Sequence, residues 1–404
     1  MMKKNNRREF LKKSILGVSG AALLPGSIYQ NVSVPSGLFP VSDLPVRILG
    51  KTGIKTPLIS MGTADATEPA FIRAAYESGI KLFFSATYYG EGNNEKLVGE
   101  GLKGLPRESF VIGTAVPPDG MDERTGKFVK PFDAGEYIKK AEGSLKRFGL
   151  DYVDICLFPY AGKKETVQNE GVLKAMEQLK KQGKTKFVGI ASHSDVEEAL
   201  NSAVESGVYD VAMIAYNYRI KNKDSLNTAI LKAAKAGMGI VAMKTMAGGS
   251  GDKSGSPQNT DAILKWVLQN DNITSIVSAM SSYEQMQKNL LMLQNIKMSD
   301  QDLKDLKLAA MDSETGLYCQ QCKKCIAQCP KNLDIPSIMR SYMYAYGYRN
   351  TLQAWHTISN VDLSAKPCES CEGCNIKCTA GFNIRKKILD IARIRDVPKE
   401  FLLA

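Results

Sequence analysis

Histidine and long hydrophobic runs are scarce in this sequence. The 404 residues include two histidines, His193 and His356, so a histidine-rich metal site and a Ser/His/Asp triad are hard to assemble. No apolar run reaches the about 20 residues that a membrane-spanning helix needs. No basic stripe alternates with aromatic residues. We therefore expect no stable membrane span and no nucleic-acid partner.

The overall composition is that of a globular protein. Hydrophobic residues make up 44% and charged residues 24%, which excludes a disordered or collagen-like chain. The length allows two or three domains and a large core. The net charge is +11, but nearly half of it belongs to the first 13 residues, so the rest is only mildly basic.

The N-terminus carries a twin-arginine pattern. Arg7 and Arg8 precede Phe-Leu-Lys and a weakly hydrophobic run, Ser14 to Leu24, which is too short to span a bilayer. We interpret residues 1–30 as a twin-arginine export signal and residues 31–45 as a linker. This predicts a periplasmic protein that folds before export. A basic, frayed terminus is the alternative, and the sequence shows no clear cleavage site.

Residues 46–310 alternate between short apolar runs and amphipathic helical stretches. This alternation predicts an α/β protein with a parallel sheet. Eight strand–helix units favour a (β/α)₈ TIM barrel over an open doubly wound sheet, because no G-x-G-x-x-G follows the first strand. The strand candidates are Leu58–Gly62, Lys81–Ala86, Phe110–Ala115, Val153–Phe158, Phe187–Ser192, Val211–Tyr216, Ile240–Lys244 and Ile273–Ser278.

Short motifs in this segment are similar to those of the aldo/keto reductase family. They are Arg47–Gly53, Tyr89-Gly90 with Asn94-Glu95, Tyr152–Asp154, Val188–Ile190 and Tyr216-Asn217. The resemblance implies hydride transfer from NADPH to a carbonyl, with a tyrosine as proton donor and a Lys, an Asp and a His assisting it.

The resemblance is incomplete at the catalytic positions. Tyr89 falls on the family's tyrosine, but the Asp, Lys and His positions hold Phe84, Ala115 and Pro159. Three of the four groups that the resemblance implies are therefore missing. Nothing that matches the motif lowers the pKa of Tyr89, which a proton donor at neutral pH requires.

The cofactor positions are also altered. Met213 replaces the Gln that would hold the nicotinamide amide, and Gln285 replaces the Arg that would hold a phosphate. The resemblance leaves Tyr216, Asn217 and Asn289 as cofactor-binding candidates, with Tyr216 where the family stacks an aromatic ring on the nicotinamide. Binding of NAD(P) stays open.

Side chains that could replace the missing Asp, Lys and His are expected at the carboxyl ends of the strands, where the active sites of barrel enzymes lie. Tyr89, His193 and Lys244 follow three different strands and are our catalytic candidates. The alternatives are a packing aromatic for Tyr89, a satisfied loop residue for His193 and a solvated lysine for Lys244.

The last 86 residues contain eight of the nine cysteines in two equal runs, C-x₂-C-x₂-C-x₃-C. These runs resemble the lobes of a two-cluster bacterial ferredoxin. The proposed metal ligands are Cys319, Cys322, Cys325, Cys329, Cys368, Cys371, Cys374 and Cys378. The resemblance implies two [4Fe–4S] clusters, with Cys378 completing the first set and Cys329 the second. Cys156 is expected to be buried in a strand.

Zinc and disulfides are the alternatives for these cysteines, and the twice-repeated close spacing argues against both. The resemblance thus predicts that residues 311–404 form a ferredoxin-like, mainly helical domain. Between the two runs, the Tyr-rich stretch Ile338–Ile358 is expected to be helical and to shield the clusters or pack on the barrel. A direct role of its aromatic residues in electron transfer is the alternative.

Together these features predict an exported iron–sulfur oxidoreductase. Its partners would be a small carbonyl or sugar-like substrate and a redox partner that exchanges electrons with the clusters. Two alternatives stay open: a non-enzymatic electron-transfer or scaffold protein with a degraded barrel, and an NADPH-dependent reductase with structural clusters.

Overall fold

The computed structural model describes residues 44–122, 126–248, 259–311, 317–364, 367–369, 371 and 373–402. The predicted signal segment 1–30 lies outside the described residues, as does the predicted linker up to residue 43. Among the described residues, no helix is both long and apolar enough to cross a membrane.

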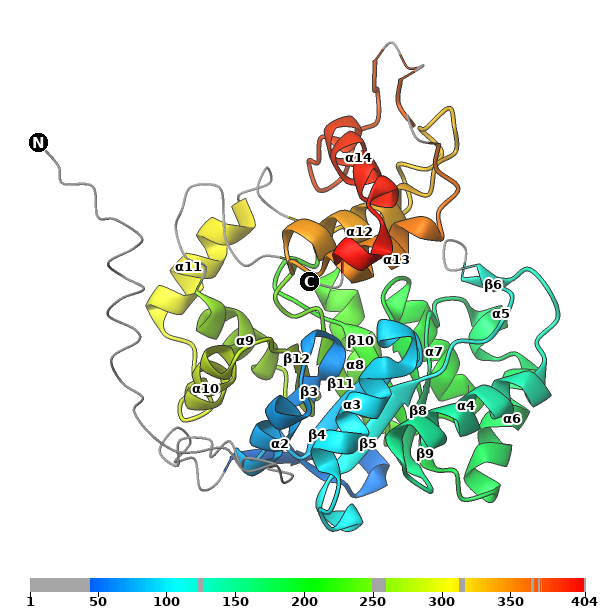
Figure 1. The fold of residues 1–404 in the computed structure, drawn as a ribbon. Coiled ribbons are helices and arrows are strands. Elements are labelled where there is room, and N and C mark those ends of the chain that lie inside the picture. The colour runs from blue at the N-terminus through cyan, green and yellow to red at the C-terminus, as the bar shows by residue number, and fades with distance from the viewer. Residues whose placement is uncertain are drawn as a thin grey trace, which may run out of the picture. The chain divides into compact units, whose positions relative to one another are not determined.

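Eight parallel strands close into a barrel (Figure 1). Each strand pairs with the next in chain order, and β12 returns to pair with β3, which closes the ring. The strands are β3 (Ile59–Gly62), β4 (Leu82–Ala86), β5 (Val111–Ala115), β8 (Val153–Phe158), β9 (Thr185–Ser192), β10 (Val211–Ala215), β11 (Gly239–Met243) and β12 (Ser275–Ala279).

This closure confirms the predicted TIM barrel, and the open doubly wound alternative is wrong. All eight strand candidates form strands, with ends that shift by two residues or fewer. The strands are buried on both faces, as parallel barrel strands are, and therefore read as continuous apolar runs.

Helices surround the barrel and follow its strands (Figure 1). Capping residues define the ends of some of these helices. For example, the Asp133 side chain accepts the N–H of Glu136 at the start of α4, and left-handed Gly149 ends that helix. The helices are α2 (Pro69–Glu77), α3 (Asn93–Leu102), α4 (Ala134–Phe148), α5 (Lys164–Val167), α6 (Glu170–Lys181), α7 (Val196–Ser206), α8 (Lys223–Lys235), α9 (Thr260–Leu268), α10 (Tyr283–Met292) and α11 (Asp300–Met311).

An N-terminal hairpin, β1 (Val46–Ile48) with β2 (Lys55–Pro57), lies at the amino end of the barrel. Leu49 is fully buried within the barrel's interior cluster. Gly50 has a φ of 52°, and a Cβ there would lie 2.4 Å from the Gly237 carbonyl oxygen. Only glycine permits this close approach, so the hairpin plugs the end of the barrel opposite the strands' carboxyl ends.

The barrel interior is apolar where the family resemblance expected charge. Phe84, Ala115 and Met213 are all buried in one interior cluster. The Phe84 ring fills space beside Gly113, where an added Cβ would lie 2.2 Å from the ring. Phe84 and Ala115, which occupy the positions where the family has its Asp and its Lys, are therefore part of the packed core.

The Asn94-Glu95 pair of the Tyr-Gly motif has a structural role. Asn94 Nδ2 donates to the Thr63 carbonyl at 2.7 Å, which ties α3 to the loop after β3. Glu95 is fully buried, accepts from Thr114 Oγ1 at 2.6 Å and pairs with Arg147 at 2.6 Å. These bonds fix helices α3 and α4 to strand β5.

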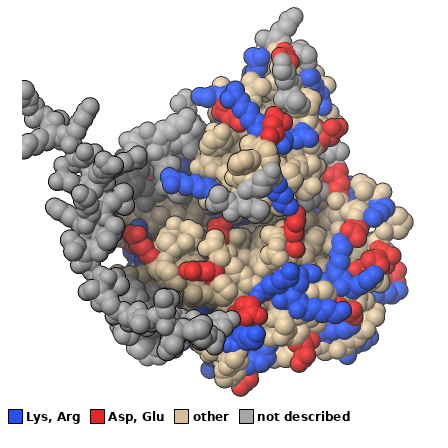
Figure 2. All heavy atoms as spheres, in the orientation of Figure 1, with Lys and Arg blue, Asp and Glu red and all other residues tan. Residues whose placement is uncertain are grey.

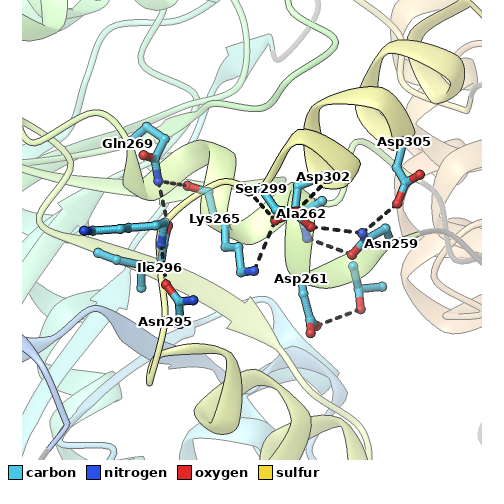
Figure 3. A network of polar contacts seen from close by, with 12 residues as sticks. Asn259, Asp261, Ala262, Lys265, Gln269, Asn295, Ile296, Ser299, Asp302 and Asp305 are labelled. Atoms are coloured by element: carbon cyan, nitrogen blue, oxygen red, sulfur yellow. Dashed lines mark hydrogen bonds and ion pairs between the residues drawn. The ribbon is translucent and has the colours of Figure 1, made fainter.

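Helix α11 follows the last barrel helix and is held to α9 by a polar network (Figure 3). Asn259 caps α9, and its Nδ2 donates to Asp302 at 3.1 Å and to Asp305 at 2.8 Å. Lys265 pairs with Asp302 at 3.2 Å. The start of the connection to the C-terminal domain is therefore fixed to the barrel.

In the described part of the C-terminal domain, the α-helices α12 (Ile335–Tyr346), α13 (Thr351–Ser359) and α14 (Ile384–Ala392) pack around an apolar cluster that includes Cys325 and Cys368. The internal repeat has a structural basis. Asp334 caps α12 and Asn383 caps α14, so a capped helix follows each cysteine run.

The predicted helical character of this domain is confirmed. On the face drawn in Figure 2, basic and acidic side chains are interspersed among uncharged residues.

Candidate active site and cluster-binding cysteines

Residues of the C-terminal domain contact the loops at the carboxyl ends of the barrel strands. Asn350 Nδ2 donates to Asp65 Oδ1 at 2.7 Å, and Lys323 pairs with Asp195 at 2.9 Å. Gln320 donates to the carbonyl of Arg219 at 3.0 Å. The end of the barrel where active sites lie in this fold is thus in contact with the domain that carries the cysteines.

The loop after β11 approaches helix α12 closely. A Cβ on Gly248 would lie 2.7 Å from Met343 Cγ, and a Cβ on Gly347 would lie 2.1 Å from the Gly248 carbonyl oxygen. In the same loop Lys244 has a left-handed φ of 56°. Such a conformation costs a non-glycine residue about 1–3 kcal/mol and clusters at functional sites.

Lys244 binds a tyrosine of the other domain. Its Nζ donates to the Tyr344 hydroxyl at 2.9 Å and also lies 5.4 Å from the Tyr348 ring centroid. Its positive charge acts on Asp65, whose pKa is nevertheless raised, chiefly by burial. Lys244 is therefore not a solvated loop lysine.

Tyr89 lies within this polar region. Burial, then the neighbouring Tyr88, Tyr344 and Asp65, raise its pKa well above 10. Its ring also packs edge-on against Tyr88, with centroids 5.1 Å apart. Tyr89 therefore stays protonated at neutral pH, since burial and each of these neighbours raise its pKa.

His193 follows β9 and faces a small cavity with Lys244. Burial lowers its pKa well below 6.5, and the charges of Lys244 and Arg340 lower it further, so the imidazole is neutral at pH 7. The cavity has a volume of about 20 Å³. Its lining residues are His193, Ala215, Lys244, Tyr318, Cys319, Gln321, Arg340 and Met343.

The structure brings three of the six barrel candidates together, because His193 and Lys244 share the cavity and Tyr89 adjoins Tyr344. Asn217 is fully buried and donates to the Lys244 carbonyl at 3.2 Å, so it holds the loop beneath Lys244.

The other two candidates lie elsewhere. Tyr216 is 2% exposed, stacks on Trp266 of α9 and donates to Asn227 of α8 at 2.8 Å, so its ring lies in the layer between barrel and helices. Stacking on a nicotinamide would require the ring to leave that packing. Asn289 of α10 donates to Ser278 at 3.1 Å, away from the cavity.

Sequence analysis missed Tyr344 and Arg340 as site residues. The signal was present, because residues 340 and 344 are four apart on α12 and share one helix face. Tyr348 follows the end of the helix, and its ring centroid lies 6.1 Å from that of Tyr344. Tyr342 and Tyr346 lie on another face, with ring centroids 4.3 Å apart.

Cys378, the last cysteine of the second run, lies near the cysteines of the first run. Burial and the nearby thiols of Cys325, Cys378 and Cys322 raise the pKa of Cys319 to about 12. Burial and Cys322 and Cys378 among its neighbours raise that of Cys325 to about 11. Cys378 is therefore placed with Cys319, Cys322 and Cys325, as the ferredoxin resemblance implies.

The second set shows the reciprocal arrangement. Burial and the thiols of Cys371, Cys374 and Cys329 raise the pKa of Cys368. Cys329 thus joins the second run. Cys156, by contrast, is buried in β8, and burial raises its pKa to about 12, as the sequence predicted for a strand cysteine.

These sets suit clusters that attach each thiolate to a different iron. All nine cysteines are free of disulfides. Within the described part of the chain, no three Cys, His, Asp or Glu side chains converge on a single ion. Cys322 Sγ lies 3.3 Å from the Thr379 hydroxyl, which can donate to a thiolate. Iron would stabilise the thiolate forms that burial disfavours.

Comparisons with known proteins agree with both domains. A model of the aldo/keto reductase family matches residues 52–262, slightly more than half of the chain, and a model of a 4Fe-4S dicluster domain matches residues 318–383. The "L-galactose dehydrogenase" of Arabidopsis thaliana is 27% identical over 62% of this chain and 88% of its own. The "L-glyceraldehyde 3-phosphate reductase" of Escherichia coli is 25% identical over 67% and 94%.

Solved structures share the barrel fold at low identity. An aldo-keto reductase of Bacillus halodurans in its holo form has a TM-score of 0.54 and 18% identity, covering 66% of this chain and 96% of its own. One of Klebsiella pneumoniae, in complex with NADP and acetate, has a TM-score of 0.52, 19% identity and the same coverage. With the closed barrel and the family match over half of its length, the chain belongs to the aldo/keto reductase family.

Proposed function

We propose that this protein is an exported iron–sulfur oxidoreductase that acts on a small carbonyl or sugar-like substrate at the mouth of its barrel. One observation carries the proposal: a single cavity is lined by His193 and Lys244 from the barrel and by Cys319 from the first cysteine set. A group bound there would lie beside both acid–base side chains and a cluster ligand.

The eight thiols would hold two [4Fe–4S] clusters, one on each set that the fold assembles. When bound, such clusters supply one-electron transfer at potentials set by burial, charge and hydrogen bonds to sulfur. The dicluster match from 318 to 383 supports iron–sulfur binding. A redox partner outside the barrel would exchange electrons with the clusters.

Side chains of the protein itself would transfer protons to and from the substrate. Lys244 holds the Tyr344 hydroxyl at 2.9 Å, and the ammonium lies where negative charge develops when that hydroxyl gives up its proton. Neutral His193 lines the same cavity and can accept or donate a hydrogen bond. Asn217 fixes the backbone of Lys244.

The relatives favour a sugar-like substrate. Two curated relatives are named as a dehydrogenase of L-galactose and a reductase of L-glyceraldehyde 3-phosphate. A Klebsiella relative of the same fold was solved with NADP. In this chain the interior positions of Phe84, Ala115 and Met213 are apolar, which argues against ordinary NADPH-dependent turnover.

One observation favours the alternative of a non-enzymatic electron-transfer or scaffold protein. The cavity at the barrel mouth, at about 20 Å³, holds little more than one water molecule. A substrate could enter only if the contacts between α12 and the loop after β11 opened.

Export by the twin-arginine route is part of the proposal. It rests on Arg7 and Arg8 and on the fit between folded-state export and a cofactor that must be inserted beforehand. The protein would then act in the periplasm.

The test uses the full chain purified without oxygen. We expect about eight irons and eight sulfides per chain. We also expect the dithionite-reduced protein to be reoxidised by at least one member of a panel of aldehydes, ketones and sugars. Stoichiometric zinc without visible absorption would refute the clusters, and full iron content with no reoxidation by any compound would favour the scaffold alternative.

A further inference from the structure

We propose that the guanidinium of Arg385 donates a hydrogen bond to sulfur of the second cluster and makes that cluster the more easily reduced of the two. This inference rests on the clusters of the proposed function. Arg385 is the second residue of α14, the helix that follows the second cysteine run. The second cluster is the one assigned to Cys368, Cys371, Cys374 and Cys329.

Arg385 carries an N–H group without a partner. Its Nε atom is buried and makes no hydrogen bond, and its Nη2 atom donates to the Cys371 carbonyl at 3.4 Å, which is a long bond. A buried donor on a charged group is costly to leave unpaired, and in a native structure it indicates a missing partner. The guanidinium is therefore poised for an acceptor that binds between the cysteines.

The position of Arg385 identifies that acceptor. Burial and the neighbouring thiols raise the pKa of Cys368, and the charge of Arg385 is the influence that opposes them. Arg385 thus lies close to Cys368 and to the backbone of Cys371, both in the second set. A cluster on these cysteines brings sulfur atoms that accept hydrogen bonds, so the donor fits the group that the thiols would hold.

The first half of the repeat has no counterpart of this cation. Ile335 begins α12 and Ile384 begins α14, each directly after the capping residue. Pro336 therefore takes the place in the first half that Arg385 takes in the second. A proline side chain has neither a charge nor an N–H, so only the second set receives this donor.

The capping residues add a second difference in charge. The cap of α12 is Asp334, whereas the cap of α14 is the neutral Asn383. Burial, the nearby thiols and the Asp334 carboxylate together raise the pKa of Cys325 in the first set. A negative charge thus acts on the first set and a positive charge on the second.

These charges set the order of the two potentials. Solvent exposure is alike, because each set contains one buried, one exposed and two half-buried cysteines. Reduction adds a negative charge, which a nearby cation favours and a carboxylate opposes. The first electron therefore resides on the second cluster. The first cluster, whose ligand Cys319 lines the cavity, is then the stronger reductant once it is reduced.

The test is an anaerobic redox titration of the cluster-loaded full chain without substrate, followed by low-temperature paramagnetic resonance. We expect two separate one-electron steps in the unmodified protein. Arg385→Met should make the higher-potential step at least tenfold less favourable, a shift of about 59 mV for one electron. The lower-potential step should stay in place.

Further variants assign the effect. Arg385→Lys keeps a charge and should shift the higher step less. Lys386→Met, the matched control, removes an exposed charge from the next position of α14 and should shift neither step. Asp334→Asn preserves the cap of α12 and should raise the lower step. Cys378→Ala, which removes a ligand of the first set, should leave the higher step present.

Equal potentials for the two clusters, an unchanged higher step in Arg385→Met, or an equal shift in Lys386→Met would overturn the inference. Arg385→Lys and Asp334→Asn keep the test decisive if Arg385→Met loses iron, which is measured for every variant. Substrate turnover without these shifts would leave the proposed function standing alone. The expected shifts without turnover of any compound would support this role of Arg385 and contradict the enzymatic function.

Discussion

The ammonium of Lys244 on the barrel donates a hydrogen bond of 2.9 Å to the hydroxyl of Tyr344 on the iron–sulfur domain. In the family chemistry a lysine assists a tyrosine within one barrel. Here Ala115 occupies the lysine position, and burial raises the pKa of Tyr89. Lys244 of the barrel and Tyr344 of the iron–sulfur domain instead make a Lys–Tyr pair between the two domains.

We expect Tyr344→Phe to lower turnover by about 10²-fold while the iron content stays unchanged. The reason is that general acid–base assistance contributes about 10²–10⁴ in rate. Tyr346→Phe is the matched control, because Tyr346 lies on the same helix and is 52% exposed. Equal rates for the two variants, measured as reoxidation of reduced clusters by substrate, would show that Tyr344 does not act as the acid.

The crossed ligand sets predict paired cluster losses. Cys378→Ala should damage the first cluster, and Cys329→Ala should damage the second, because each thiol lies with the other run. Anaerobic iron analysis and low-temperature paramagnetic resonance of each reduced variant would distinguish the remaining cluster. If Cys378→Ala instead left the first cluster intact, the sets would not cross.

The buried pair of Glu95 and Arg147 makes a prediction about stability. Arg147→Met leaves the fully buried Glu95 carboxylate without its cation, which typically costs about 3–5 kcal/mol. Chemical denaturation should report this loss. Lys174→Met, which breaks an exposed pair with Glu170, should change the free energy of unfolding by about 1 kcal/mol or less. Similar losses for both variants would contradict the structural role of Glu95.

The sequence was informative wherever one residue pattern determined the local structure. The eight strands were predictable because strands buried on both faces are continuous apolar runs. The ferredoxin resemblance implies the crossed cysteine sets, and the repeat that carries the resemblance also contains the capping residues Asp334 and Asn383.

The rest depended on how distant segments meet. The contact of Tyr344 with Lys244 joins positions 100 residues apart, and no local pattern encodes it. The same holds for Tyr216, which turns toward Trp266 although its motif matches the family. Asn94 and Glu95, also in a matching motif, hold helices in place instead of facing the cavity.

The export proposal predicts a defect from a charge-conserving change. Arg7→Lys combined with Arg8→Lys should leave the protein in the cytoplasm, because the twin-arginine pathway recognises the arginine pair. Cell fractionation with immunodetection measures the distribution. Periplasmic protein at the unmodified level in the double variant would contradict the signal interpretation.

The most direct test is which reductant supports turnover by the protein. The cluster-loaded protein is mixed with the substrate panel and either NADPH or a reduced viologen, and turnover is measured with each, alongside NADPH binding by intrinsic fluorescence. We predict viologen-dependent turnover that Lys244→Met abolishes, and very weak NADPH oxidation. Tight NADPH binding with NADPH turnover of about 1–10³ per second, and no turnover with viologen, would contradict it.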